Sequence, residues 1–174
     1  MKLLEDDRIH LRSLEPEDLD LLYKWENDSM LWSLGSTVSP YSYYILKEYI
    51  ASSDKNIYEQ RQLRLMISLK EYDETVGMID LYDFDPHNRR AGIGILIDAE
   101  YQRLGYGKSA VRLIIDYAFH FLKLHQLYVH VPVENTASIK LFLACGFTES
   151  GILKDWNSVA EGFRAVSVMQ LIQD

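Results

Sequence analysis

One stretch of the sequence, residues 91–121, limits the folds that this chain can adopt. Its apolar run at residues 91–97 has the length and composition of a buried strand, and an amphipathic helix of about 15 residues follows it. The loop between them reads Gln102-Arg103-Leu104-Gly105-Tyr106-Gly107 and is followed by Lys108. The first N–H groups of a helix lack intrahelical acceptors and lie at the positive end of its dipole. The sequence therefore predicts that an anion such as a phosphate binds at the start of this helix.

Two phosphate-binding motifs overlap in this loop. Gly107-Lys108-Ser109 matches the end of a nucleoside-triphosphate P-loop, but that motif requires a Gly where this chain has Gln102, and no later strand ends in a metal-binding Asp. The other interpretation treats Gln102-x-x-Gly105-x-Gly107 as one unit, whose glycines let a phosphate approach the backbone. These six residues alone leave a third interpretation open, in which the glycines only shape a turn before a core helix.

The hydrophobic pattern of the whole chain predicts the element order β-α-α-β-β-β-α-β-α-β-β. The predicted strands lie at residues 8–14, 62–70, 75–84, 91–97, 127–133, 147–153 and 163–172, and two helices fill residues 15–28 and 39–53. Short polar turns make the strands between residues 62 and 97 an antiparallel meander, and a helical crossover makes strands 91–97 and 127–133 parallel if they are adjacent. We therefore expect an α/β (α+β) fold with a mixed sheet flanked by helices.

Length, charge and cysteine content narrow the class of protein. A chain of 174 residues is most economically one domain, spanning residues 1–174. The net charge of −8, from 18 basic and 26 acidic residues, argues against nucleic acid or an anionic membrane as partner and mildly favours cationic ligands. Short apolar runs and the lone Cys145 favour a cytoplasmic location. No residues have the spacing of metal ligands, so we expect no metal.

A second motif, Asn135-x-x-Ser138-x-x-x-Phe142-x-x-x-Gly146-Phe147, lies on the predicted helix at residues 136–144 and just beyond it. Together the two motifs resemble the signatures of the GNAT superfamily of acyl-CoA-dependent N-acetyltransferases. The resemblance covers residues 8–172 and is strongest to the branch that contains bacterial spermidine acetyltransferases and ribosomal-protein N-terminal acetyltransferases. It implies the GNAT fold, with parallel, splayed central strands, and acetyl-CoA as cosubstrate.

The resemblance also implies which residues bind CoA. The backbone of three strand residues would pair with the pantetheine arm, the loop would hold the pyrophosphate, and the second motif would contact the arm and the thioester sulfur. In that order these residues are Ile95, Leu96 and Ile97; Gln102, Arg103, Leu104, Gly105, Tyr106, Gly107 and Lys108; and Asn135 and Phe142.

Asp80 and Asp83 are the candidate catalytic residues, because an amine must lose a proton before it attacks a thioester. Strand alternation puts the two carboxylates on opposite faces unless a bulge intervenes. In the family the leaving thiolate commonly takes a proton from a Tyr, and Phe142 occupies that position here. Spermidine-type relatives also have Glu where this chain has Gly92, and acidic residues where it reads Leu34-Gly35-Ser36-Thr37.

We therefore predict an acetyl-CoA-dependent N-acetyltransferase that transfers the acetyl group directly to a primary amine, with a polyamine-like acceptor. One alternative is a protein N-terminal acetyltransferase of the ribosomal-protein type. The other is a CoA-binding module with little transferase activity, motivated by Phe142 and Gly92. Family analogy also predicts a homodimer or a larger homo-oligomer.

Overall fold

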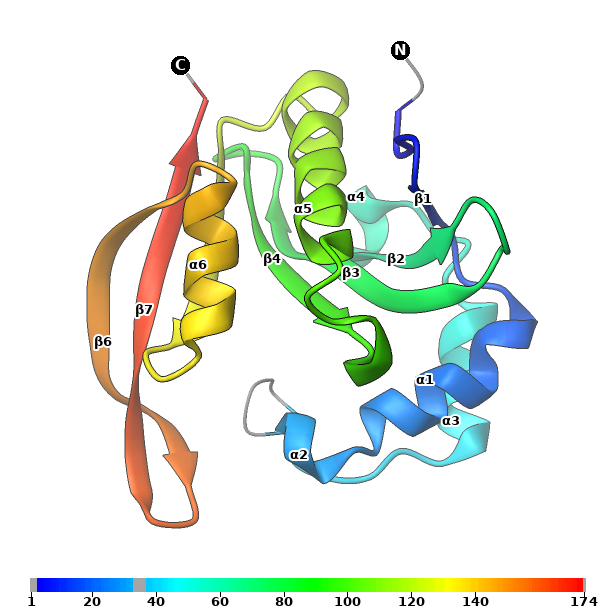
Figure 1. Ribbon diagram of the computed structural model, residues 1–174, viewed down its shortest axis with the longest axis horizontal. Coiled ribbons are helices and arrows are strands. Elements are labelled where there is room, and N and C mark those ends of the chain that lie inside the picture. Colours follow the sequence, from blue (N-terminus) through cyan, green and yellow to red (C-terminus); the bar gives the residue numbers. More distant parts are fainter. Residues whose placement is uncertain (1–2, 33–36, 174) are drawn as a thin grey trace.

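The protein is described by a computed structural model, which covers residues 3–32 and 37–173. Within these ranges a seven-stranded sheet has the order β1-β2-β3-β4-β5-β7-β6. Every neighbouring pair is antiparallel except β4 and β5, which are parallel. The strands are β1 Ile9–Arg12, β2 Leu63–Leu69, β3 Thr75–Asp85, β4 Arg90–Ile97, β5 Gln126–Pro132, β6 Thr148–Val159 and β7 Gly162–Ile172 (Figure 1).

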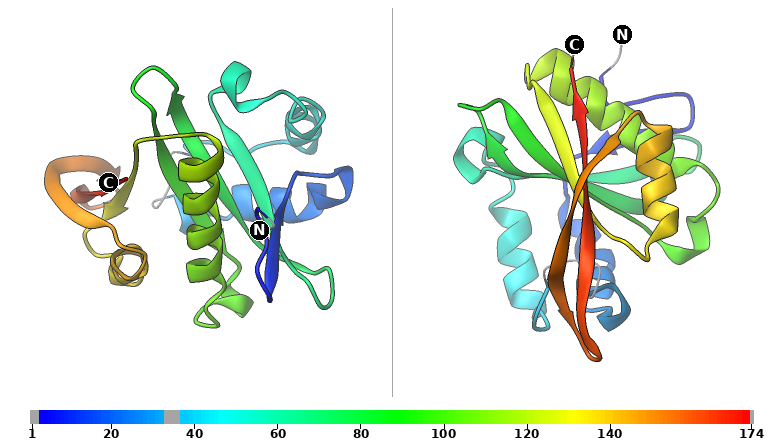
Figure 2. Two further views of the ribbon diagram at one scale, coloured as in Figure 1. Left: turned by 90° about the horizontal axis from the view of Figure 1, so that it is seen from above. Right: turned by 90° about the vertical axis from the view of Figure 1, so that its left-hand side faces the viewer.

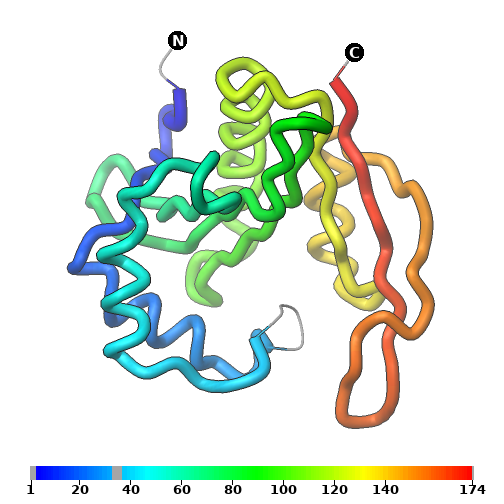
Figure 3. The backbone as a smooth tube through the Cα atoms, turned by 180° about the vertical axis from the view of Figure 1, so that it is seen from behind, coloured from blue at the N-terminus to red at the C-terminus, as the bar shows by residue number. Residues whose placement is uncertain are grey.

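Helices cover both faces of this sheet (Figures 1 and 2). One face carries α5 and α6, and the other carries α1 and α3, which lie in front of the sheet when the molecule is seen from behind (Figure 3). The helices are α1 Leu19–Glu26, α2 Ser29–Trp32, α3 Tyr43–Ala51, α4 Ile57–Gln60, α5 Tyr106–Asp116 and α6 Thr136–Ala144, with 3₁₀ turns η1 Pro16–Asp18 and η2 Ala99–Tyr101 and a π-helical turn η3 Tyr117–Phe121.

The predicted fold class is confirmed: a mixed sheet flanked by helices, with the expected order of the main elements. One boundary was wrong. The segment after residue 153 was expected to be a polar loop, but β6 runs to Val159 and forms a long hairpin with β7. Its pairing is interrupted between Leu153 and Asn157, where Asp155 has a φ of 51°. The bulge breaks the alternation of apolar and polar residues, which is why the sequence pattern did not indicate a strand.

Two apolar clusters hold the helices to the sheet. The α5 face buries Ile79, Leu81, Ile93, Val111 and Ile114. The α1 and α3 face buries a separate cluster of Leu14, Leu22, Trp25, Leu46, Ile50, Met66 and Met78. The central strands β2, β3 and β4 therefore contact helices on both faces, which makes them the rigid base of the molecule.

A carboxylate at the end of β4 ties α1 to the sheet. Asp98 Oδ2 accepts hydrogen bonds from Lys24 Nζ and Trp25 Nε1, both at 2.8 Å. Burial acts to raise the pKa of Asp98, and the bonds from Lys24 and Trp25 outweigh it, so the pKa lies below its usual value. The ionised carboxylate thus fixes α1 beside the point where β4 ends.

Pairing between β4 and β5 is short. It comprises Arg90 with Gln126, Ala91 with Leu127 and Gly92 with Tyr128. Beyond these pairs the two strands diverge, since β4 continues to Ile97 and β5 to Pro132 without pairing to each other. We call this gap, between residues 93–97 of β4 and residues 129–132 of β5, the splay. The expectation of parallel, splayed central strands is confirmed.

The close packing of β3 on β4 gives a test of the fold. A Cβ on Gly77 would lie 2.2 Å from the Leu96 carbonyl oxygen, which is backbone and cannot turn aside. We expect Gly77→Ala to lower the free energy of unfolding by about 2 kcal/mol, because the strands must separate to admit the methyl group. Gly151→Ala is the matched control, since a Cβ there meets nothing within 4 Å. Equal urea midpoints for the two variants would contradict the prediction.

Candidate functional site

The loop before α5 has an unusual backbone. Arg103 has a φ of 64° and Gly105 a φ of 87°, so two left-handed residues precede the helix. The first hydrogen bond into the helix runs from Ser109 N to Gly105 O at 3.2 Å. In the described part of the chain, the N–H groups of Tyr106, Gly107 and Lys108 have no acceptor. These exposed donors at the positive end of α5 form an anion-binding concavity.

The two glycines of this loop serve different purposes. Gly105 takes a φ that only Gly adopts readily, and a Cβ there would lie 3.1 Å from Arg8 Nη1. A Cβ on Gly107 would instead point at Ile97 and Leu141, both at the ordinary contact distance of 3.6 Å. At Gly107 the Cβ direction therefore faces side chains of the protein, and the explanation of this Gly as an opening for a phosphate stays a prediction.

Gln102 closes the other end of the loop. Its side-chain amide donates to the Ile97 carbonyl oxygen at 3.0 Å, so the loop is attached to the last residue of β4. Leu104 is exposed at 52% and Lys108 is half-buried at the start of α5. The predicted loop residues therefore lie together at the end of the splay.

A cavity of about 120 Å³ lies inside the splay. It is lined by three elements, β4, β5 and α6, through Ile93, Gly94, Ile95, Val129, His130, Val131, Pro132, Asn135, Ser138 and Phe142. The structure thus brings together the predicted residues Ile95, Asn135 and Phe142. Leu96 and Ile97 do not line it: their side chains pack against the two apolar clusters, Leu96 toward α1 and Ile97 toward α5. A larger cavity of about 650 Å³ between η1, α1 and α3 contains none of these residues.

Asn135 and Phe142 occupy opposite ends of α6. Asn135 Oδ1 caps the helix by accepting from Ser138 N at 3.2 Å, which leaves the Asn135 amide N–H groups as donors without a partner in the described part of the chain. Phe142 is 1% exposed and packs edge-on against Phe147, with ring centroids 5.1 Å apart. Phe142 therefore gives the cavity an apolar wall and offers no proton.

Asp80 is bound in an ion pair. Arg64 donates to both its oxygens, at 2.8 and 2.7 Å, and also pairs with Glu26 of α1. Burial acts to lower the pKa of Arg64, and the charges of Asp80 and Glu26 outweigh it and raise that pKa. The guanidinium also lies 5.5 Å from the ring of Tyr49. Asp80 is thus held through both of its oxygens by a permanent cation.

Asp83 lies on a β-bulge. Pairing of β3 with β4 shifts between Tyr82 and Asp85, and Asp83 has a φ of 48°. The bulge that was needed to bring both carboxylates to one face is therefore present. Burial raises the pKa of Tyr128, and the nearby carboxylate of exposed Asp83 raises it further. Asp83 has no ion pair within the described ranges.

The sequence did not single out Tyr82 as a site residue. Its ring lies over Gly92, where a Cβ would come within 2.4 Å of ring carbons. It also contacts Tyr128 edge-on, with centroids 5.9 Å apart. Burial raises the pKa of Tyr82, and electrostatic interaction with Tyr128 and Asp83 raises it further. Its phenol therefore stays neutral. Gly92 therefore makes room for an aromatic ring of the protein, and the signal that could have revealed it is the pairing of residues 82 and 92 in the predicted meander.

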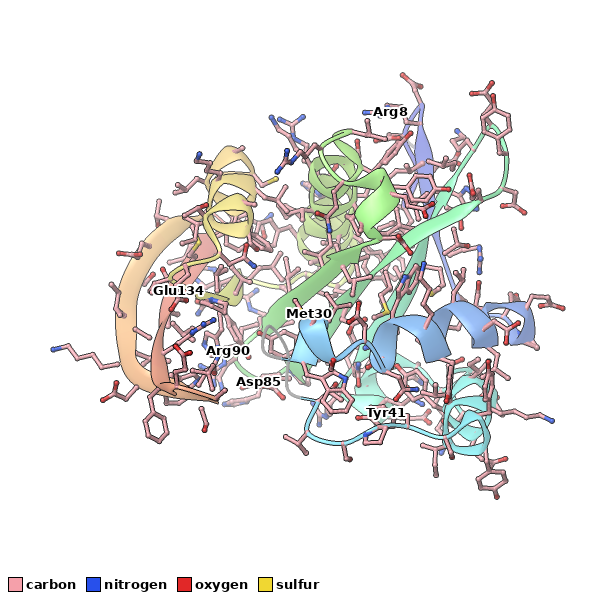
Figure 4. All side chains as sticks on the ribbon, turned by 60° about the horizontal axis from the view of Figure 1, so that its bottom comes forward. Arg8, Met30, Tyr41, Asp85, Arg90 and Glu134 are labelled. Carbon is pink, nitrogen blue, oxygen red and sulfur yellow. The ribbon has the colours of Figure 1, made fainter. Side chains whose placement is uncertain are left out.

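Charged side chains lie at the start of β4 and just after the end of β5, where Arg90, Asp85 and Glu134 are labelled in Figure 4. Arg90 pairs with Asp85 at 3.3 Å, and Glu134 with Arg164 at 3.5 Å. The segment that reads Leu34-Gly35-Ser36 lies outside the described residues, so its effect on the site stays a prediction. No group of three or more His, Cys, Asp or Glu side chains in residues 3–32 and 37–173 is arranged to hold a metal ion. No helix in these ranges has the length and apolar character needed to cross a membrane.

Comparison with known proteins agrees with this geometry. The model of the Acetyltransferase (GNAT) domain family matches residues 8–148. The chain belongs to the GNAT acetyltransferase family.

Individual relatives agree with this assignment. The Spermidine N(1)-acetyltransferase of Escherichia coli is 31% identical over 145 residues, which cover 83% of this chain and 75% of the relative. The crystal structure of spermidine N-acetyltransferase from Vibrio cholerae in complex with CoA and spermine superposes with a TM-score of 0.85, at 28% identity and 97% coverage of both chains. A dodecameric structure of the Vibrio cholerae enzyme in an intermediate state has a TM-score of 0.80, at 27% identity, and covers 97% of this chain and 95% of that one. This GNAT enzyme is an acetyl-CoA-dependent N-acetyltransferase, as the two motifs predicted.

The contact between Tyr82 and Gly92 gives a test of the site. We expect Gly92→Ala to displace the Tyr82 ring and to cost about 2 kcal/mol of stability, because the added methyl group would overlap the ring. Gly94→Ala is the matched control, since its Cβ would meet Asp80 Cβ at an ordinary 3.8 Å. Thermal unfolding of both variants measures the difference, and a Gly92→Ala midpoint equal to that of Gly94→Ala would show that the ring is free to move.

Proposed function

We propose that acetyl-CoA binds along the splay of this GNAT enzyme. The backbone of Ile95, Leu96 and Ile97 would pair with the pantetheine amides as an added strand would, because this part of β4 has no strand partner on its β5 side. The loop residues 102–108 would hold the pyrophosphate on the free N–H groups at the start of α5. Asn135 would donate to the arm through its free amide, and Phe142 would form the wall beside the sulfur.

The chemistry of this site needs two contributions from the protein, a hydrogen-bond donor to the oxyanion and a base. A backbone N–H of β4 in the splay stabilises the oxyanion that develops on the thioester carbonyl. Phe142 provides no acid, and a thiol with an ordinary pKa of about 8.5 leaves as an anion without one. An amine that enters as an ammonium must still lose a proton before it attacks, so a base beside the splay is required.

We infer that Asp83, rather than Asp80, is this base. Asp83 is exposed, makes no ion pair in the described ranges and lies near Tyr128, which pairs with Gly92 at the start of the splay. Asp80 is held by Arg64 through both oxygens. A carboxylate that is paired in this way accepts a proton less readily than a free one.

The acceptor that we propose is a small cationic primary amine of the polyamine type. The observation that carries this proposal is the group Glu26, Arg64 and Asp80, whose two carboxylates and one guanidinium leave one excess negative charge beside Gly94. The side chains of Glu26 and Asp80 are 14% and 17% exposed to solvent, so an ammonium group can reach them. Likeness to enzymes named for spermidine supports the same acceptor class.

An acceptor panel tests this proposal. Release of free CoA from acetyl-CoA is followed with spermidine, diamines, amino-acid amides and peptides that begin with Ala or Ser. We expect kcat/KM for spermidine to exceed kcat/KM for the amino-acid amides and the peptides by about tenfold or more. This ratio corresponds to about 1.4 kcal/mol. Glu26→Gln should raise the KM for spermidine and leave the KM for acetyl-CoA unchanged. A preference for the peptides would instead favour protein N-terminal acetylation.

Asp83→Asn and Asp80→Asn form a matched pair for the base assignment. We expect Asp83→Asn to lower kcat by about 10²-fold and to remove the acidic limb of the pH–rate profile, because the proton acceptor is lost. Asp80→Asn should instead reduce stability by about 3 kcal/mol, since it leaves the buried guanidinium of Arg64 with one carboxylate. The opposite pattern, with full activity in Asp83→Asn, would return the base role to Asp80.

The oligomeric state and the cellular location of this enzyme are also proposals. We propose a homo-oligomer, supported by the dodecameric relative, and a cytoplasmic enzyme that binds neither nucleic acid nor membranes, supported by the net charge of −8. Sedimentation of the purified protein tests the first statement, since a monomer at micromolar concentration would exclude it.

A further inference from the structure

A side chain from the first strand contacts the loop before α5. Arg8, which lies just before β1 and is labelled in Figure 4, donates through Nη2 to the Leu104 carbonyl oxygen at 2.7 Å. Its guanidinium carbon lies 4.5 Å from the centre of the Tyr106 ring, the first residue of α5. Nη1 lies 3.1 Å from the position that a Cβ of residue 105 would take. One planar group thus contacts Leu104 and Tyr106, on either side of Gly105.

This contact determines the direction of a backbone N–H group. The carbonyl and the N–H of a trans peptide point in opposite directions, and the described chain has no cis peptide bond. Because Arg8 holds the Leu104 carbonyl on its own side, the Gly105 N–H of the same peptide is turned to the other side. Gly105 can adopt many backbone conformations, and Arg103 is a non-Gly residue with a φ of 64°, so a contact from outside the loop helps to keep this peptide in one orientation.

Arg8 is itself held in place. Asp6 Oδ1 accepts from Arg8 N at 2.8 Å and from Ile9 N at 2.9 Å. Burial acts to raise the pKa of Asp6, while these two N–H groups and the hydroxyl of Ser109 outweigh it and lower the pKa. Asp6 therefore stays ionised and fixes the backbone of Arg8 and Ile9 at the start of β1.

We propose that Arg8 is a positioning residue for the acyl donor: by binding the Leu104 carbonyl and stacking on Tyr106, it orients the N–H groups of the loop toward the pyrophosphate of CoA. The proposal rests on the assignment of residues 102–108 as the pyrophosphate site. Arg8 acts through the loop and takes no part in the transfer step. The first strand, remote in sequence from both CoA motifs, thereby contributes to donor binding.

Truncated donors make this proposal testable. Acetyl-pantetheine carries the thioester and the pantetheine amides but no pyrophosphate, so it does not use the loop. We expect Arg8→Ala to raise the KM for acetyl-CoA about tenfold, the effect of one lost charge-assisted hydrogen bond. The kcat with saturating acetyl-CoA, the KM for the amine, and kcat/KM with acetyl-pantetheine should all stay within about twofold, a split that a general loss of structure does not produce.

Two further variants separate the geometry of Arg8 from its charge. Arg8→Lys keeps the charge but lacks the planar group that reaches Leu104 and Tyr106 together, so we expect a KM close to that of Arg8→Ala. Arg8→Gln keeps a donor on a shorter stem and serves as the second test if Arg8→Ala does not fold; its KM for acetyl-CoA should also rise. Lys47→Ala, which removes an exposed charge on α3, is the control and should change none of these constants.

Distinct results overturn the proposal and its premise. An unchanged KM for acetyl-CoA in Arg8→Ala, full recovery in Arg8→Lys, or an equal loss with acetyl-pantetheine would each overturn the positioning role. If the wild-type enzyme used acetyl-pantetheine as well as acetyl-CoA, residues 102–108 would not be the pyrophosphate site, and the assignment on which the proposal rests would fail instead.

Discussion

The end of pairing between β4 and β5 after Gly92 and Tyr128 is the constraint on which the rest of the site depends. Unpaired backbone groups at the centre of a sheet are costly unless another molecule or side chain satisfies them. Here they face a cavity and lead directly into the loop before α5. A ligand with amides in an extended arm and phosphates at one end satisfies both parts, and this is the chemistry of CoA.

Charge on the other face of the sheet is arranged around one cation. Arg64 neutralises one of the two negative charges of Asp80 and Glu26 and attaches α1 to β2 and β3. Removing either carboxylate would leave a buried charge poorly compensated, so the group is structural as well as electrostatic. The base that we propose, Asp83, lies outside this group, on a bulge of β3.

Much of this was predictable because it is local in the sequence. The strand, the loop with Gln102 and Gly105, the helix start and the cap at Asn135 each depend on residues within a few positions of one another. The contacts that the sequence did not reveal join distant positions. Arg8 and Leu104 are 96 residues apart, and Arg64 and Asp80 meet only through the register of β2 with β3. Hydrophobic periodicity predicts which face a residue occupies but not its partner on that face.

The hydrogen bonds of Asp98 have a consequence for how the two substrates meet. This carboxylate joins α1, whose Glu26 we propose to bind the amine, to the end of β4, along which we propose that the thioester lies. The spacing between the attacking nitrogen and the carbonyl carbon is thus a property of the folded chain, present before either molecule arrives. An enzyme built in this way gains rate by having already lost the freedom that two reactants in solution must give up.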